Sequence, residues 1–184
     1  MNIRYFLLLM VLILASAYSV SAQSVESMYT ELKGKTCRTL ERNDEEAGYL
    51  LTQCQGVGGY KLQVAAGDDR ETITVVKPDG SKHELNLGQV GGGGFSYVGP
   101  RAEWRVRREN GRIIPVALIV RLNVSTAPSD PSKTTSYLTV SKITSQKICL
   151  VEAVTPKPNA NEAARVAADS AASKACYEET SSGN

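Results

Sequence analysis

The chain has 184 residues, of which 21 are Lys or Arg and 19 are Asp or Glu, so its formal net charge is +2. A charge so near balance argues against a dedicated nucleic-acid binder, which normally carries a strongly basic face or arm. Hydrophobic residues make up 42% of the chain, which argues against disorder over most of its length and predicts one globular unit.

The first 22 residues have the pattern of a secretory signal peptide. Arg4 gives a positive start, residues 6–15 are apolar, and small residues lead to Ala22, after which we expect cleavage. About ten apolar residues are too few to cross a bilayer, which takes about 20. Gln23 follows the cleavage site, where a bacterial lipoprotein would carry a lipid-bearing Cys. We therefore expect export, periplasmic or secreted, without a stable membrane anchor.

Residues 23–184 are predicted to form one β-rich domain. Short strands separated by turns dominate its sequence, and one of them directly precedes Asn110. The others are expected at residues 37–41, 49–54, 60–65, 72–77, 82–87, 113–120, 137–143 and 148–154. The predicted fold class is α+β but mainly β: a curved or barrel-like antiparallel sheet, one C-terminal helix and two disulfides.

The four cysteines of an exported chain predict disulfide bonds. A polar turn at residues 43–48 lies between two candidate strands, and a hairpin centred on it puts Cys37 opposite Cys54. Directly opposed residues of such a pair are close enough for a disulfide. We therefore predict a bridge between Cys37 and Cys54, and by elimination a bridge between Cys149 and Cys176.

Residues 78–80 form a Pro-Asp-Gly turn between two strands, because Pro fixes one dihedral angle and Gly accepts a positive φ. The resulting pairing gives one face the period-2 pattern of a half-buried hairpin. That face carries Ile73, Val75, Leu85 and Leu87. His83 falls on the same face, where we expect a partly covered edge residue rather than a ligand.

Asn110 and Gly111 predict a second hairpin. Its pairing places Trp104, Val106, Ile113 and Ala117 on one face, and Arg105, Arg107, Ile114 and Val116 on the other. The strand at 113–120 is apolar on both faces and is predicted to be central in the sheet. Pro115 cannot donate to a ladder, so a bulge or an unpaired position is expected there.

The C-terminal segment predicts a helix over about 159–177. Asn159 can cap it, Glu162 stands at the capping-box position, and seven alanines follow without Gly or Pro as far as Cys176. Alanine side chains bury little surface, so docking of this helix needs a further tie. A bridge from Cys176 to Cys149 on the last strand would supply it. The tail at 180–184 and the loop at 125–133 are expected to be mobile.

Several short patterns are spread along the chain: Cys54, Gly56, Gly58, Gly59 and Tyr60; Gly67, Asp69 and Arg70; Glu103, Trp104 and Arg105; Pro115, Ala117, Ile119 and Arg121; Cys149; Asn161, Ala164, Arg165, Ala168, Asp169 and Cys176. In this combination the chain resembles a family of small exported bacterial proteins to which no activity is assigned. The resemblance covers most of the chain after the signal peptide. It implies an exported bacterial protein and no particular chemistry.

The glycine run at 91–94 is followed by Phe95, Ser96 and Tyr97. A phosphate-binding loop would need Lys and Ser or Thr directly after the glycines, so we expect a flexible loop between strands. Exposed aromatic residues on it could form a recognition surface. The stretch is also similar to the S-G-x-x-Y loop of periplasmic lysozyme inhibitors of the membrane-bound type, although Gly93 stands where that motif has Ser.

Arginines concentrate between residues 101 and 121. If Arg105 and Arg107 share a sheet face, they could bind an anionic partner such as a cell-surface polymer through charge-assisted hydrogen bonds. The alternative is a solvated strand balanced by Glu103 and Glu109.

Motifs for catalysis and metal binding are absent from the sequence. It holds no G-x-S-x-G, S-x-x-K, H-E-x-x-H or C-x-x-C, and its single His excludes a two-histidine metal site. The acidic run at 44–46 lacks the alternating spacing of a calcium loop and predicts a solvated turn. We expect no cofactor, no metal and no enzymatic activity.

The expected function is therefore that of an exported binding or interaction module of the bacterial envelope, with an envelope protein or an anionic surface polymer as its partner. Two alternatives stay open. One is an inhibitor of a secreted hydrolase such as lysozyme. The other is a periplasmic enzyme, in which a Ser/His/Asp arrangement would have to use His83.

Overall fold

The computed structural model describes residues 24–45, 48–125, 130 and 133–177. The predicted signal peptide and the predicted mobile tail lie outside this part of the chain. So does most of the loop expected at 125–133.

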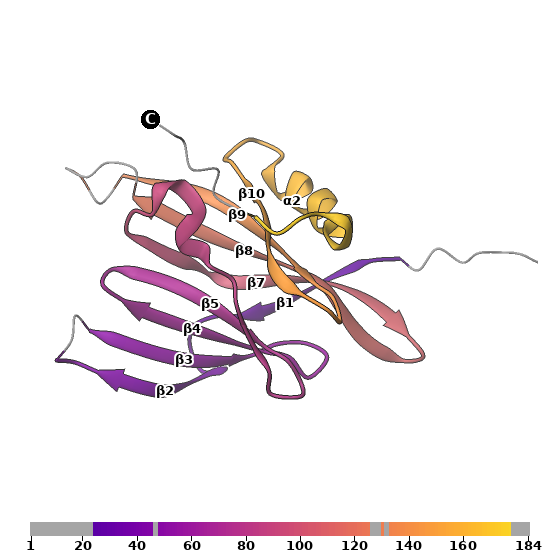
Figure 1. Cartoon of the computed structure of the whole chain (residues 1–184), viewed down its shortest axis with the longest axis horizontal. Helices are drawn as coiled ribbons and strands as arrows, with labels where there is room; N and C mark the ends of the chain where they lie inside the picture. Colours follow the sequence, from indigo (N-terminus) through magenta and orange to yellow (C-terminus); the bar gives the residue numbers. More distant parts are fainter. Residues whose placement is uncertain (1–23, 46–47, 126–129, 131–132, 178–184) are drawn as a thin grey trace, which may run out of the picture.

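In the described residues, ten strands form one mostly antiparallel sheet, accompanied by one α-helix and two 3₁₀ segments (Figure 1). The elements are β1 (Glu26–Glu31), β2 (Cys37–Asn43), β3 (Tyr49–Gln55), β4 (Lys61–Gly67), β5 (Arg70–Val76), β6 (Lys82–Glu84), η1 (Leu87–Gly92), β7 (Ser96–Glu109), β8 (Arg112–Ser125), β9 (Thr134–Ile143), β10 (Ile148–Val154), α2 (Ala160–Asp169) and η2 (Ala171–Ser173). The strand order is β10-β9-β8-β7-β5-β4-β3-β2. This architecture confirms the predicted fold class.

The sheet divides at β7, because one edge of β7 pairs with two different strands, β5 and β1. β8 pairs along one edge of β7. On the other edge, β5 makes a single parallel pair, Arg70 with Ser96, and β1 pairs antiparallel further along, from Arg101 to Val106. The strands β2 to β5 and β7 to β10 therefore form two halves that diverge from this junction (Figure 1).

A main hydrophobic core fills the space between the two halves, and Trp104 is its largest fully buried side chain. The Trp104 indole donates a hydrogen bond to Thr30 Oγ1 at 2.8 Å and meets the Tyr60 ring edge to face. Gly56 lies directly against this indole, since a Cβ atom there would be 2.7 Å from Trp104 Cζ2. The Gly-rich turn between β3 and β4 is thus shaped around Trp104.

A second, smaller core lies on the opposite face of β8 and β9, under α2. Four alanines of α2 and η2 provide its upper surface: Ala164, Ala167, Ala168 and Ala171. They pack on aliphatic residues such as Val140 and Val154. Small side chains let the helix approach the sheet closely, but each of them buries little apolar area.

The β2–β3 hairpin has the predicted register at the disulfide and a shifted register near its turn. Cys37 pairs with Cys54, and a disulfide joins them with the Cα atoms 4.0 Å apart. A bulge at Leu40 then moves Glu41 opposite Leu51. The predicted bridge is confirmed, whereas the sequence did not indicate the bulge.

The β5–β6 hairpin is confirmed, with Val75 opposite His83. The four aliphatic residues predicted to share its inner face are all buried. However, β6 ends at Glu84 rather than at Leu87, because Asn86 adopts a left-handed conformation with φ of 51° that turns the chain into η1.

The β7–β8 hairpin is also confirmed at its turn, where Arg107 pairs with Ile114. The predicted irregularity at Pro115 is a bulge at Val116, after which Arg105 pairs with Ala117. Ala117 therefore faces α2 and not the core around Trp104, so its predicted facing was wrong. β8 is also longer than the predicted 113–120, since β7 and β8 have 14 residues each.

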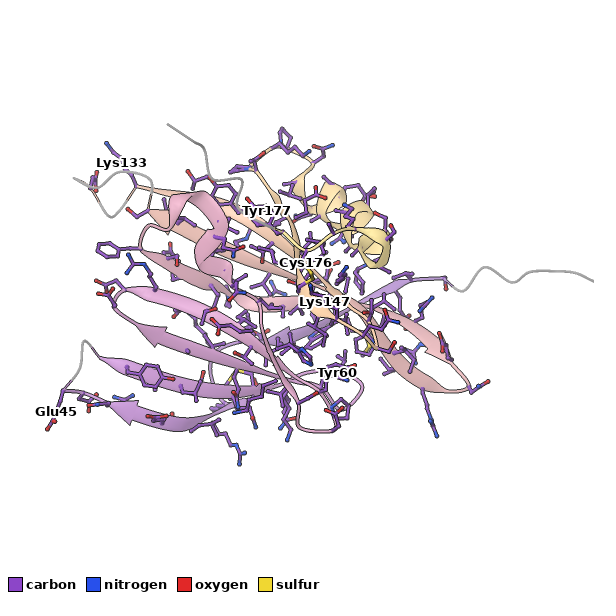
Figure 2. All side chains as sticks on the ribbon, viewed as in Figure 1. Glu45, Tyr60, Lys133, Lys147, Cys176 and Tyr177 are labelled. Carbon is purple, nitrogen blue, oxygen red and sulfur yellow. A yellow bond between two sulfur atoms is a disulfide. The ribbon has the colours of Figure 1, made fainter. Side chains whose placement is uncertain are left out.

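The C-terminal helix is shorter than predicted, since α2 ends at Asp169. The Ser170 hydroxyl lies 3.1 Å from the carbonyl oxygen of Val166 in the last turn of α2, where it competes with continuation of the helix. The chain then turns through η2 and returns to β10, where Tyr177 N–H donates to the Leu150 carbonyl (Figure 2). This return forms the Cys149–Cys176 disulfide, which is confirmed.

Candidate functional site

The two arginines predicted to bind an anion share one face of β7 but have different surroundings. Arg105 is 8% exposed, and its guanidinium donates to both carboxylate oxygens of Asp169, at 2.7 and 2.9 Å. It also donates to Ser27 Oγ and to the Val25 carbonyl. These internal partners use the donors of Arg105 that an external anion would need.

Arg107 remains partly exposed. Its Nε lies 3.7 Å from a carboxylate oxygen of Glu109 and has no hydrogen-bond partner among the described residues. It lines a recess of about 430 Å³ together with Pro115, Ile143 and Asp169. Arg105 and Arg107 thus do not form one anion-binding pair.

Glu103, two residues before Arg105, makes a second ion pair with α2. Arg165 Nε donates to Glu103 Oε1 at 2.7 Å, and Arg165 also donates to the hydroxyl of Tyr29 on β1. Ser27 donates to the same carboxylate. We call the two ion pairs, Glu103 with Arg165 and Arg105 with Asp169, the helix clamp.

Burial alone would raise the pKa of Glu103. The hydrogen bonds from Arg165 and Ser27, and the charges of Arg165 and Arg105, outweigh burial and lower that pKa below its ordinary value of 4.5. The Glu103 carboxylate raises the pKa of Arg165 in turn. Both groups of this pair are therefore held in their charged forms.

The spacing of the helix clamp follows from the geometry of its two elements. Residues i and i+2 of a strand lie about 6.6 Å apart on one face, and residues i and i+4 of a helix are separated by about 6 Å along its axis. The spacing of Glu103 and Arg105 on β7 is therefore similar to that of Arg165 and Asp169 on α2, and the residues that face each other have opposite charges. Sequence reasoning found each pattern separately but not their pairing, because the partners are 62 and 64 residues apart.

The glycine run at 91–94 begins inside η1 and continues into a turn that packs on β8. Three of its members, Gly91 to Gly93, have positive φ values. A Cβ at Gly94 would come within 2.4 Å of the Ser125 carbonyl oxygen. The segment expected to be a flexible loop at 91–94 therefore packs closely on its neighbours at Gly91 and Gly94, whereas Gly92 is exposed with open space around it.

Of the three predicted recognition residues, two are exposed. Phe95 and Tyr97 are 43% and 48% exposed, whereas Ser96, the first residue of β7, is buried in the sheet. The Arg70 guanidinium lies over the Phe95 ring, 5.5 Å from its centroid, and Arg70 Nη1 donates to Asp68 Oδ2 at 2.6 Å. We call Arg70, Phe95 and Tyr97 the aromatic edge.

Two recesses open beside the aromatic edge at the junction of β5 and β7. One, of about 450 Å³, is lined by all three residues of the aromatic edge. The other, of about 440 Å³, is lined by Arg70, Tyr49 and Gln89 among others. The junction that divides the sheet thus places exposed aromatic rings and a cation next to concave surface.

His83 lies on β6 and is half-buried, as expected for a partly covered edge residue. Its Nε2 is 3.5 Å from Ser81 Oγ, but that hydroxyl donates to Asp79 Oδ1 at 2.6 Å. Hydrogen bonds from Ser81 lower the pKa of Asp79 to about 2. In a catalytic triad the hydroxyl donates to the histidine, which the carboxylate orients. The arrangement here is that of an Asp-stabilised turn.

Neither a metal site nor a membrane span is evident in the described residues. They contain no group of three or more His, Cys, Asp or Glu side chains placed to hold a metal ion. None of the helices in this part of the chain is long and apolar enough to cross a membrane. Two disulfides are typical of proteins that fold in an oxidising compartment outside the cytoplasm.

No protein-family model, curated protein or solved structure matches the chain.

Proposed function

We propose that the chain is a non-enzymatic binding protein of the bacterial envelope, periplasmic or secreted, and that the aromatic edge contacts its partner. The observation that carries the proposal is the alternation at the start of β7, where two half-exposed aromatic residues flank a buried serine beside Arg70. Aromatic residues and arginine are enriched where proteins bind one another. Aromatic side chains offer a large contact area at low entropic cost.

Two features of the aromatic edge support this use. It is preorganised, because Ser96 is fixed in the sheet by pairing with both Arg70 and Val124. Preorganised side chains lose less entropy on binding. It also lies beside concave surface on both sides of Arg70, into which a partner's side chains could fit.

The test is a pull-down from the native envelope fraction with the oxidised protein and with Phe95→Ala/Tyr97→Ala. We expect the wild type to retain a partner in high salt and the double variant to lose it. Leu40→Ala is the matched control, because Leu40 is an exposed apolar residue on the distant strand β2. Equal retention by wild type and the double variant, or no retained partner with the wild type, would contradict the proposal.

The same experiment separates the inhibitor alternative from the general one. If the retained partner is a secreted hydrolase, its activity is measured with wild type and with the double variant. Inhibition that depends on Phe95 and Tyr97 would identify the partner class. Binding without inhibition would favour an interaction module.

A further inference from the structure

A further concave surface lies beside α2 and is formed by residues of β1, β7, β8, β9 and the helix. It is a recess of about 340 Å³, which we call the arginine recess. It is lined by Tyr29, Arg101, Glu103, Ile119, Arg121, Leu138, Asn161 and Arg165. Three of these residues are arginines and one is acidic.

The arginines of the recess differ in how far their charges are already neutralised. Arg165 is held by Glu103 in the helix clamp, and Glu162 lies 4.0 Å from it. Arg121 Nη1 donates to the neutral hydroxyl of Ser136 at 2.7 Å. Within the described part of the chain, Arg121 has no carboxylate partner.

Arg101 is the second uncompensated cation. It lies in the irregular stretch of β7 between Val98 and Ala102, where pairing with β8 is interrupted. No hydrogen bond or ion pair involves its side chain among the residues that the structure describes. Glu31 is its cross-strand neighbour but forms no ion pair with it in that same part of the molecule.

The position of Arg121 depends on a glycine beside it. A Cβ at Gly99 would lie 2.9 Å from Arg121 Cβ, so only glycine leaves the stem of Arg121 room against β7. The irregular stretch of β7 thus provides Arg101 and accommodates Arg121. The two cations are presented on adjacent strands around one opening.

Two aliphatic residues, Ile119 and Leu138, also line the recess, and each exposes a small part of its surface, 4% and 6%. A guanidinium donates paired hydrogen bonds to two oxygens of a planar carboxylate or of a tetrahedral phosphate. Concave sites that combine an apolar base with a few charged groups bind small molecules that have both an apolar body and a charged end.

We infer that the arginine recess binds an oxyanion, a carboxylate or a phosphate, attached to a small apolar group. Arg101 and Arg121 hold the oxyanion, and Ile119 and Leu138 contact the apolar group. Arg165 adds positive charge but remains tied to Glu103. This site is independent of the aromatic edge, with which it shares no residue.

The test is isothermal titration calorimetry with benzoate, phenyl phosphate and inorganic phosphate at low and high salt. We expect one of the two phenyl compounds to bind the wild type at low salt, more tightly than inorganic phosphate and more weakly in high salt. Whichever phenyl compound binds better distinguishes a carboxylate ligand from a phosphate ligand. Binding of none of the three probes at low salt would overturn the inference.

The variant Arg101→Gln/Arg121→Gln locates the site. Losing both charge-assisted contacts should weaken binding by at least about tenfold. Neither residue takes part in the helix clamp, so the variant should unfold at the same temperature as wild type. Arg112→Gln, which removes an exposed arginine at the β7–β8 turn, is the matched control and should bind like wild type. Equal affinity of wild type and the double variant would overturn the inference.

Discussion

Arg105 on β7 and Asp169 at the end of α2 form a two-pronged ion pair across the face of the sheet, at 2.7 and 2.9 Å. Together with the pair between Glu103 and Arg165 it fixes both the position and the direction of the helix. Reversing the helix would set Glu103 against Asp169, which are both acidic. The four charges therefore select one docking of an alanine-rich helix whose apolar contacts alone discriminate weakly between registers.

The first prediction concerns this ion pair. Asp169→Ala leaves the nearly buried guanidinium of Arg105 without its carboxylate, so we expect a loss of about 2–3 kcal/mol in the free energy of unfolding, measured with urea. Arg105→Ala should cost a similar amount, and the double variant less than the sum of the two. Arg107→Ala, on the same face of β7, should cost under about 1 kcal/mol. Additive effects of the two single variants would contradict the pairing.

The second prediction concerns acid. The folded-state pKa of Glu103 lies below its ordinary value of 4.5, so this group contributes stability that is complete above pH 4.5 and is lost as the pH falls through the folded pKa. Urea unfolding from pH 7 to pH 3 should therefore show a loss of stability that is smaller in Glu103→Gln. Glu41→Gln, on the exposed strand β2, is the control and should follow the wild-type pH dependence.

The third prediction concerns the disulfides. In the chain-entropy description, Cys149–Cys176 closes 27 residues and contributes about 3.5 kcal/mol, and Cys37–Cys54 closes 17 residues and contributes about 3 kcal/mol. Removal of either disulfide should thus cost a similar amount of stability, but the two removals should loosen different parts of the molecule. In hydrogen exchange, Cys149→Ser/Cys176→Ser should lose protection in α2, whereas Cys37→Ser/Cys54→Ser should lose it in β2. Equal protection of α2 in both variants would contradict the role of the second bridge as the tie for the helix.

The fourth prediction concerns the turn between β3 and β4. Gly56→Ala would push a methyl group into Trp104 Cζ2 and the Tyr60 carbonyl oxygen, both 2.7 Å away, so we expect destabilisation by about 2–3 kcal/mol in urea. Gly88→Ala is the control, because its added methyl group meets nothing within 4 Å and its φ is not positive. Changes within about 0.5 kcal/mol for both variants would show that the turn can move away from Trp104.

Local chemistry was sufficient to predict the three hairpins and both disulfides. Turn residues such as Asn110 and Gly111 set the pairing of the strands on either side of them. In the same way the polar turn at 43–48 put Cys37 opposite Cys54, and the bridge between Cys149 and Cys176 followed by elimination. Strand β1 was missed because its sequence, ESMYTE, has no apolar alternation. It is held in the sheet by pairing with β7, about 75 residues away, which no local signal reports.

The candidate site was less predictable. Phe95 and Tyr97 stood out as aromatic residues after glycines, but Arg70 joins them only through the parallel contact between β5 and β7. The bulge at Val116 reverses the facing of later β8 residues, which a constant register cannot anticipate. Likewise, Arg105 looked available for an external anion because its partner Asp169 is 64 residues away.

The contacts of Arg105 also govern when the molecule can fold. Its guanidinium joins Val25 and Ser27, near the start of the described chain, to Asp169, near its end. Contacts so distant in sequence carry a large entropic cost of loop closure and form slowly. A chain still being synthesised lacks Asp169 until α2 has been made. The contacts of Arg105 therefore cannot be complete before this helix exists, so β1 and β7 stay without their tie to α2 while the strands between them and the helix are synthesised.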